Sequence, residues 1–145
     1  MKSKLLVRND AATYALVLDT NDEVVESLTA FANEQALGAA HFTGIGALRS
    51  AVLGYFDWQK KDYKRIPMEQ QVEVVSLIGD IALANGKPMV HAHIVLGRAD
   101  GTAYAGHLLE GRVRPTLEVV LTESPAPLRR THDEASGLLL IDLSA

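Results

Sequence analysis

The chain has 145 residues, a mass of 15.7 kDa and a formal net charge of −4, from 14 Lys and Arg against 18 Asp and Glu. It has no cysteine, which excludes a disulfide scaffold, a thiolate nucleophile and a cysteine-ligated metal site. The acidic balance excludes a general positive field that would attract phosphates, although a local basic face is compatible with it. The length and the 48% apolar content suit one folded unit, so we expect residues 1–145 to form a single domain.

The N-terminal segment is not typical of a targeting signal. Lys2, Lys4 and Arg8 interrupt its short apolar stretches, so the apolar region of a secretory signal is missing. No run of about 18 consecutive apolar residues occurs anywhere in the chain, which argues against a membrane-spanning helix. We therefore expect a cytoplasmic protein with no membrane partner.

The first clear element in chain order is a helix that begins near residue 20. Thr20 and Glu23 have the spacing of a capping box, in which two side chains satisfy free backbone N–H groups of the first turn. Apolar residues follow at helical spacing from Val24 to Phe31, and Gly38 is typical of a helix terminator. This pattern predicts one long amphipathic helix.

Most of the remaining sequence is typical of β-strands separated by turn-forming residues. The predicted strands are residues 14–18, 40–43, 51–58, 72–78, 90–97, 102–109, 117–122 and 138–143. The clearest turns lie at residues 59–62, 85–86 and 99–101. Many strands joined by short turns around one helix predict an α+β fold, in which a largely antiparallel sheet carries one long helix packed on it.

Most catalytic signatures are missing from the sequence. Gly44 and Gly46 begin like a dinucleotide-binding loop, but the sixth position of that motif is Arg49, so the spacing fails. Neither a phosphate-binding Walker lysine motif nor a Gly-x-Ser-x-Gly nucleophile elbow is present. We interpret the glycine pair as a place where the backbone bends or approaches another segment closely.

Three of the five histidines lie in one predicted hairpin, at His91, His93 and His107. His91 and His93 point to the same side of a strand, because side chains alternate. A two-residue loop would pair residues whose numbers sum to 201 and turn His107 to the opposite face. A three-residue loop over 99–101 gives a sum of 200, places His107 opposite His93, and puts Gly101 where that loop needs a left-handed residue.

Three converging neutral imidazoles are a suitable ligand set for a divalent metal such as zinc, and they leave one coordination position open. The alternative is three ordinary histidines on a half-buried sheet. We interpret His41 and His132, which lie outside the cluster, as structural or surface residues.

Four charged residues near the histidines in sequence could assist chemistry or simply face solvent. They are Glu110, Glu118, Arg112 and Arg114. Glu110 falls on the opposite face if its strand continues regularly, and lone carboxylates are abundant on protein surfaces. We favour a solvated or salt-bridged carboxylate for both acids, whereas the two arginines could hold an anion or face water.

Residues 55–65 combine four basic side chains with four aromatic ones, which is the composition of a nucleic-acid-binding surface. The same segment is also typical of an amphipathic hairpin with a charged tip. The acidic balance of the chain favours the hairpin.

The order and spacing of several motifs resemble the plant- and prokaryote-conserved (PPC) domain family. The motifs are residues 42–47, 53–57, 91–97, 100–101, 106–111 and 118–120. The resemblance extends from about the predicted helix at Thr20 to the final predicted strand, which is most of the chain. Ala105 departs from the family pattern, in which a second glycine precedes the Gly-His pair, and this adds one methyl group to the hairpin.

The resemblance implies an α+β fold related to that of acetolactate decarboxylase, a zinc enzyme that uses a His-x-His pair and a third histidine. Residue by residue, His91, His93 and His107 correspond to the three histidines of the family. They are therefore the expected ligands of a divalent metal, with zinc as the first choice. The resemblance also implies assembly as a homotrimer.

Family members are commonly labelled DNA-binding, because plant members couple this domain to AT-hook segments with an Arg-Gly-Arg-Pro core. Here Val113 stands between Arg112 and Arg114 where that core has glycine, so the chain has no AT-hook. DNA is therefore a partner suggested by the label but supported neither by charge nor by an AT-hook.

Three functions stay open at this point. The first is a trimeric interaction module of unassigned biochemical role. The second is a metal-dependent lyase or hydrolase that acts on a small carboxylate or carbonyl compound, with catalytic residues that the sequence does not identify. The third is a purely structural metal site that clamps the hairpin.

Overall fold

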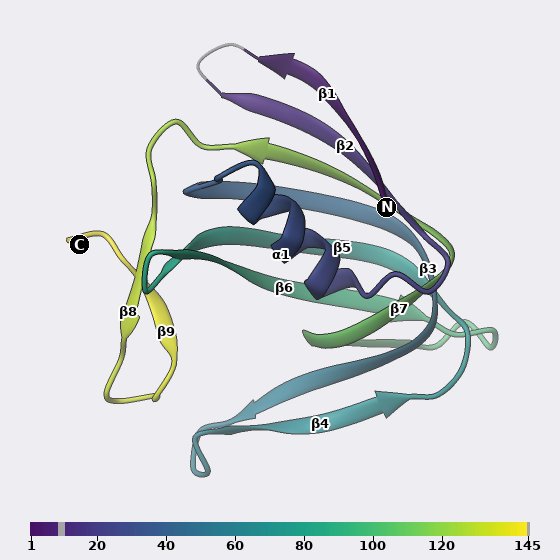
Figure 1. Ribbon diagram of the computed structural model, residues 1–145. Coiled ribbons are helices and arrows are strands. Elements are labelled where there is room, and N and C mark those ends of the chain that lie inside the picture. Colours follow the sequence, from purple (N-terminus) through teal and green to yellow (C-terminus); the bar gives the residue numbers. More distant parts are fainter. Residues whose placement is uncertain (9–10, 145) are drawn as a thin grey trace.

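The computed structural model describes residues 1–8 and 11–144 and contains, within them, nine strands and one short helix (Figure 1). In chain order the elements are β1 (Lys2–Arg8), β2 (Ala12–Asp19), α1 (Val24–Glu34), β3 (Ala39–Asp57), β4 (Asp62–Met68), β5 (Val72–Ala84), β6 (Lys87–Gly97), β7 (Ala103–Glu123), β8 (Arg129–His132) and β9 (Leu139–Asp142). The expectation of a single domain over residues 1–145 stays a prediction.

The described strands form one sheet in the order β1-β2-β7-β3-β5-β8-β9. Strand β4 pairs with β3, and β6 pairs with both β5 and β7, so β3, β5, β6 and β7 pair in a closed ring. The pairing is antiparallel except between β5 and β8, which meet in parallel over two residue pairs. The sheet is therefore mixed but largely antiparallel, as the short turns in the sequence predicted.

The longest strands join segments that the sequence predicted as separate. Residues 40–43 and 51–58 fall almost entirely in β3, and residues 102–109 and 117–122 fall almost entirely in β7. Register shifts along the β3–β7 pairing allow both strands to bend without ending. A Cβ atom on Gly46 would lie 2.3 Å from the backbone oxygen of Thr116, so the interpretation of close backbone approach is confirmed here. Strands β1, β4 and β8 were missing from the predicted strand segments, although the hairpin interpretation of residues 55–65 includes the start of β4.

The helix begins at a different cap from the predicted one. Glu23 is the N-cap, and its Oε2 accepts a hydrogen bond of 2.7 Å from the backbone N–H of Glu26. The hydroxyl of Thr20 instead donates to the backbone oxygen of Pro115 at 2.9 Å. The capping box centred on Thr20 is therefore wrong, because the long β7 strand takes that side chain as a partner.

The prediction of a long helix is also wrong, because α1 has 11 residues. It ends before Gly38 is reached. Just after the helix, Ala36 adopts a left-handed backbone with φ of 52°, and the N–H of Leu37 donates to the carbonyl of Ala32 at 2.9 Å. This pattern closes a helix in the way that glycine usually does. The described part of the chain holds no helix with the length and hydropathy needed to cross a membrane.

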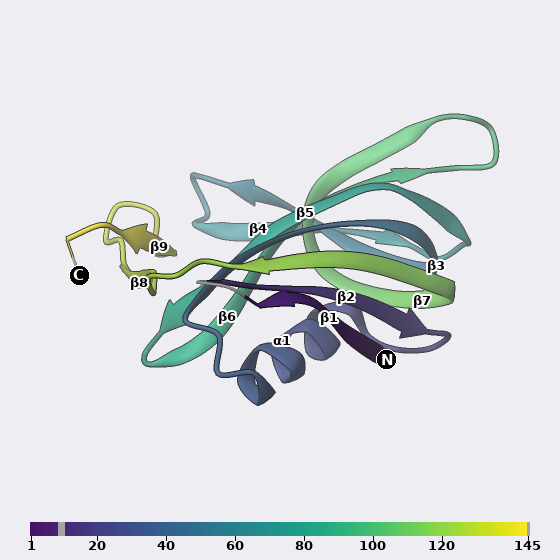
Figure 2. The same ribbon diagram turned by 90° about the horizontal axis from the view of Figure 1, so that it is seen from above.

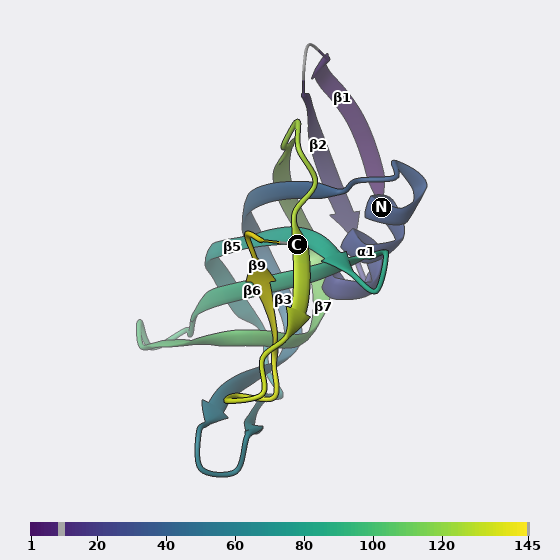
Figure 3. The ribbon, with the colours of Figure 1, turned by 90° about the vertical axis from the view of Figure 1, so that its left-hand side faces the viewer.

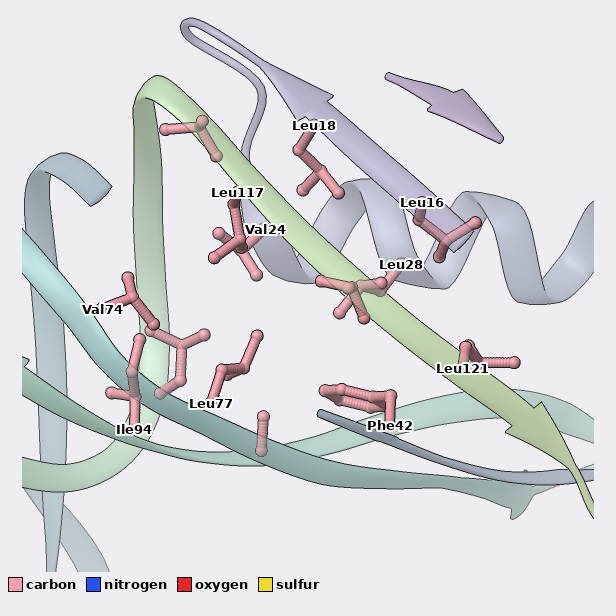
Figure 4. Close-up of a cluster of buried hydrophobic side chains, with 14 of the residues drawn as sticks. Leu16, Leu18, Val24, Leu28, Phe42, Val74, Leu77, Ile94, Leu117 and Leu121 are labelled. Atoms are coloured by element: carbon pink, nitrogen blue, oxygen red, sulfur yellow. The ribbon is translucent and has the colours of Figure 1, made fainter. Parts of the chain in front are cut away.

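Helix α1 lies against one face of the sheet, as seen from above and from the side (Figures 2 and 3). The core side chains pack between them. Val24 and Leu28 of α1 pack there among Leu16, Leu77 and Leu117 of the sheet (Figure 4). Side chains alternate along β6, where the even-numbered residues from 92 to 96 are buried. The odd-numbered residues of β6, which include two histidines, therefore point away from this core.

Candidate metal centre

The hairpin of β6 and β7 brings the three histidines together. In the observed register His93 pairs with His107, and Gly97 pairs with Ala103. Both pairs sum to 200, which confirms the three-residue loop and excludes the two-residue alternative.

The chemistry of that loop explains the register. Gly101 has φ of +82° and donates its N–H to the carbonyl of Arg98 at 2.9 Å. Asp100 accepts hydrogen bonds from both the backbone N–H and the hydroxyl of Thr102, at 3.0 and 2.6 Å. An aspartate that satisfies the following backbone and a glycine in the left-handed region are the usual components of such a loop. The register that aligns the histidines is therefore encoded locally.

The three imidazole rings form a compact cluster. The ring centroids lie 5.2 Å apart for His91 and His93, 5.1 Å for His91 and His107, and 5.5 Å for His93 and His107. One ring nitrogen of each residue lies within 4.8 Å of those of the other two. Ring nitrogens this close are a plausible ligand set for one ion, and three protein ligands are the number found in open zinc sites.

The surroundings of the cluster favour uncharged rings. Burial, followed by the nearby His91 and His93, lowers the pKa of His107 from 6.5 to about 4. Burial and then His91 lower the pKa of His93. Both rings are therefore neutral near pH 7, which is the form that binds a metal. The buried Nδ1 of His107 has no hydrogen-bond partner among the described residues, so a ligand for that nitrogen is compatible with the structure.

Two side chains that the sequence did not single out contact the cluster. Asp80 of β5 lies opposite His91, with its Oδ2 3.6 Å from Nδ1 of that ring. Burial raises the pKa of Asp80, but contacts with His91 and then Arg130 outweigh this effect and hold the pKa below its usual range. Tyr63 of β4 stacks on His107 with centroids 4.6 Å apart, and burial raises the pKa of its phenol.

The strand register set by a second turn could have identified Asp80 from the sequence. Asn85 and Gly86 form a two-residue loop with both φ angles positive, and the flanking strands pair residues that sum to 171. This register places Asp80 opposite His91. Tyr63 lies in the local β3–β4 hairpin, but its contact with His107 depends on the long-range pairing of β3 with β7, for which the sequence has no comparable local signal.

A shallow depression of about 310 Å³ opens beside two of the histidines. Its lining residues are Ile78, Gly79, Asp80, His91 and His93. The space is large enough for a small molecule next to the cluster, and it has both apolar and charged walls.

The charged residues near the histidines in sequence lie outside the cluster. Glu110 is exposed and forms an ion pair with Arg65, and the guanidinium of Arg112 contacts the backbone oxygen of Asn21 at 3.4 Å. Arg114 is likewise exposed. The interpretation of Glu110 as a solvated or salt-bridged surface carboxylate is confirmed.

Glu118 and the two remaining histidines also lie away from the cluster. Glu118 is exposed on β7, on the side of the sheet that lies away from the helix. His41 is exposed on β3 opposite Asp80, and His132 is exposed on β8. These positions confirm their interpretation as surface residues.

Known proteins resemble this chain over most of its length. A Pyrococcus horikoshii plant- and prokaryote-conserved protein is 34% identical, with a TM-score of 0.84 over 90% of this chain and 92% of that one. A metal-containing protein from Archaeoglobus fulgidus is 36% identical, with a TM-score of 0.84 over 97% and 99%. A "putative DNA-binding protein" from Bacteroides thetaiotaomicron is 27% identical, with a TM-score of 0.89 over 99% of both chains.

Two further similarities show less: the first concerns the fold alone, and the second covers a small part of the relative. A Staphylococcus aureus protein similar to alpha-acetolactate decarboxylase is 13% identical, with a TM-score of 0.55 over 76% of this chain and 51% of that one. This likeness concerns the fold alone and agrees with the expected fold relationship. The bifunctional protein GlmU of Synechococcus sp. is 31% identical over 129 residues, which are 87% of this chain but 20% of that protein. The chain thus spans about a fifth of that curated relative.

The family profile of the Plants and Prokaryotes Conserved (PCC) domain matches residues 7–125. This range contains the three histidines, the loop that aligns them and the glycine pair of β3, all of which the sequence had already indicated. The chain therefore belongs to the plant- and prokaryote-conserved domain family.

Proposed function

We propose that this protein is a metal-binding PPC-domain module in which His91, His93 and His107 hold a divalent cation, with zinc as the first choice. The observation that carries the proposal is the approach of three ring nitrogens to within 4.8 Å of one another on the β6–β7 hairpin. The low pKa of His107 keeps this ring uncharged at neutral pH, so that one of its nitrogens has a lone pair for a metal. The metal-containing protein of Archaeoglobus fulgidus, at 36% identity, supports the same proposal.

A second candidate function is metal-dependent chemistry on a small carboxylate or carbonyl compound, as a lyase or hydrolase. A bound divalent ion would supply a Lewis acid with a coordination position open to water or substrate. The depression beside His91 and His93 favours this candidate, because it offers space next to the ligands. Asp80 provides a fixed negative charge at its wall, and Ile78 provides an apolar surface.

We also propose that copies of this chain assemble into a homotrimer through the sheet face that lies opposite the helix. Ile45, Val75 and Ile78 are 62%, 59% and 55% exposed, and they line a groove of about 490 Å³ with few polar groups. Exposed apolar surface of this kind marks an interaction site. Ile78 also lines the depression at the histidines, so a second copy on this face would reach the edge of the candidate metal centre.

The β3–β4 hairpin gives no support to a nucleic-acid-binding function. Within residues 55–65, Lys61 donates to the backbone oxygen of Glu134 at 3.1 Å, and Arg65 pairs with Glu110. These cations have acceptors within the chain, and the overall charge is −4. We therefore do not extend the role of the Bacteroides protein to this chain.

The metal proposal is tested by elemental analysis and zinc titration of the tag-free chain. We expect about one ion per chain, and loss of binding in a His91→Ala/His93→Ala variant. His41→Ala is the matched control, since His41 is an exposed histidine outside the cluster, and it should bind zinc normally. A wild-type chain that neither contains nor takes up zinc would refute the proposal.

Cobalt(II) substitution separates a catalytic from a structural site. If a coordination position is open, acetate should change the visible spectrum of the bound cobalt, because a carboxylate would enter that position. An unchanged spectrum would favour a closed structural site and would count against the enzyme candidate.

The trimer proposal is tested by light scattering after size-exclusion chromatography. We expect a mass of three chains for the wild type and a smaller mass for Val75→Glu. Leu140→Glu is the control, because Leu140 is exposed on β9 away from the groove. A monomeric wild type would refute the proposal.

A further inference from the structure

We propose that Arg130 is a positioning residue for His91 and acts on it through Asp80. In this arrangement the C-terminal β8–β9 hairpin sets the orientation and the tautomer of one ring in the histidine cluster. The effect on metal affinity rests on the proposed function, whereas the effect on the His91 ring requires no metal.

The contacts form a continuous chain from the hairpin to the ring. The Nη2 of Arg130 donates to Oδ1 of Asp80 at 2.5 Å, and its Nη1 donates to the backbone oxygen of Leu139 at 3.1 Å. The other carboxylate oxygen, Oδ2 of Asp80, faces Nδ1 of His91 at 3.6 Å. The two oxygens of one carboxylate are thus divided between the guanidinium and the imidazole.

Of the three residues in this chain of contacts, Arg130 is the most buried. The Arg130 side chain is 5% exposed, whereas Asp80 is 32% and His91 is 37% exposed. A buried guanidinium needs a carboxylate partner, because an unpaired charge in that place is strongly destabilising. The planar guanidinium also donates to the backbone oxygen of Leu139, which restricts the orientation in which it binds the carboxylate. Arg130 therefore fixes the direction in which Asp80 points.

The position of Arg130 follows from strand pairing. Strand β8 adds to the end of β5 in parallel, with Leu83 opposite Arg129 and Ala84 opposite Arg130. Figure 1 shows the β8–β9 hairpin beside this end of β5 and β6. Residue 130 lies beyond residues 7–125, which the family profile matches, so the C-terminal segment supplies this partner from outside the family motif.

The consequence for His91 is a defined tautomer. A carboxylate beside Nδ1 favours the proton on that nitrogen and leaves the lone pair on Nε2. Carboxylates that hold a histidine in this way orient metal ligands and increase their basicity, and their removal weakens metal binding by about 10–100-fold. Arg130 would thus contribute to metal affinity without contacting the metal.

The first experiment measures the tautomer in metal-free full-length protein. Long-range ¹H–¹⁵N correlation at a fixed pH of about 8 distinguishes Nδ1–H from Nε2–H for each neutral histidine. We expect His91 to be in the Nδ1–H form in the wild type and to become a mixture of tautomers in Arg130→Gln and Asp80→Asn. Arg130→Lys should restore much of the wild-type spectrum, because it keeps a cation beside Asp80. Arg129→Gln is the matched control, since Arg129 is exposed on the same strand, and it should leave the spectrum unchanged.

The second experiment titrates the same variants with zinc. We expect the Kd to rise about 10-fold or more in Arg130→Gln and Asp80→Asn, and less than about twofold in Arg129→Gln. If the wild type binds no zinc, the proposed metal function fails, and the tautomer comparison still decides the role of Arg130.

Two results would overturn the inference. One is a wild-type His91 in the Nε2–H form, and the other is a folded Arg130→Gln protein whose His91 shifts equal those of the wild type. Circular dichroism checks the fold of each variant. Should Arg130→Gln not fold, Asp80→Asn takes its place, and unchanged His91 shifts in that variant refute the inference equally.

Discussion

Glu23 links the start of the helix to the strand that carries His107. Its side chain is buried, with 7% exposure, and both carboxylate oxygens accept backbone hydrogen bonds. Oε2 accepts from the N–H of Glu26 at 2.7 Å, and Oε1 accepts from the N–H of Gly111 at 2.8 Å, 88 residues along the chain. We predict that Glu23→Ala lowers the free energy of unfolding substantially.

The magnitude follows from the two bonds. Loss of the helix cap costs about 1 kcal/mol. The N–H of Gly111 is then left without its partner in a buried place, which costs about 1–3 kcal/mol more. The expected loss is therefore about 2–4 kcal/mol for Glu23→Ala. Glu23→Gln keeps one acceptor oxygen, so it should lose about half as much.

Urea denaturation followed by circular dichroism measures these losses. All proteins are compared at one protomer concentration, because self-association would shift the apparent stability. Glu26→Ala is the matched control: Glu26 is an exposed acid in the same turn, and its loss should cost about 0.5 kcal/mol. A Glu23→Ala protein as stable as the Glu26→Ala protein would refute the reasoning.

Three further predictions concern single sites. Ala36→Gly should raise the urea midpoint and stabilise by about 0.5–1 kcal/mol, because residue 36 has φ of 52° and glycine adopts that conformation at lower cost. Gly46→Ala should destabilise the protein more than Gly86→Ala in the same assay. A Cβ at position 46 would lie 2.3 Å from the backbone oxygen of Thr116, whereas a Cβ at position 86 would meet open space. Equal losses of stability in the two variants would contradict this prediction. The metal-free protein should lose stability as the pH falls from 6.5 toward 4. In this range His107 binds a proton in the unfolded chain but stays neutral in the folded one, because its pKa is lowered to about 4. Urea titrations at several pH values should show a smaller dependence of stability on pH for His107→Asn.

Much of the candidate metal centre could be predicted from the sequence because its geometry depends on turns. The loop over residues 99–101 aligns His93 with His107, and strand alternation adds His91 to the same face. A turn type depends on a few neighbouring residues, so its consequence for register can be deduced from their identities. The same reasoning at Asn85 would have added Asp80.

The helix boundaries could not be predicted in this way. Thr20 has the chemistry of a cap, but in the folded chain it donates to Pro115, and Glu23 becomes the cap because β7 supplies a second donor for its carboxylate. The helix ends at Glu34 with Gln35 as its C-cap, and packing of Leu37 in the core compensates for the cost of the left-handed Ala36 that follows the cap. Local propensity is worth about 1 kcal/mol in each case, so a tertiary contact of similar size overrides it.

The sequence by itself determined the family, the sheet-rich fold and the three histidines on one face, since these depend on short motifs and on the alternation of side chains. Only the tertiary structure decided how β3 and β7 continue through their bends, and which side chains from distant strands surround the histidines. Tyr63 contacts His107 because β3, its hairpin partner, pairs with the distant strand β7. Arg130 contacts Asp80 because β8 pairs with the distant strand β5. Such pairings are selected by the packing of the whole core, and no local pattern contains that information.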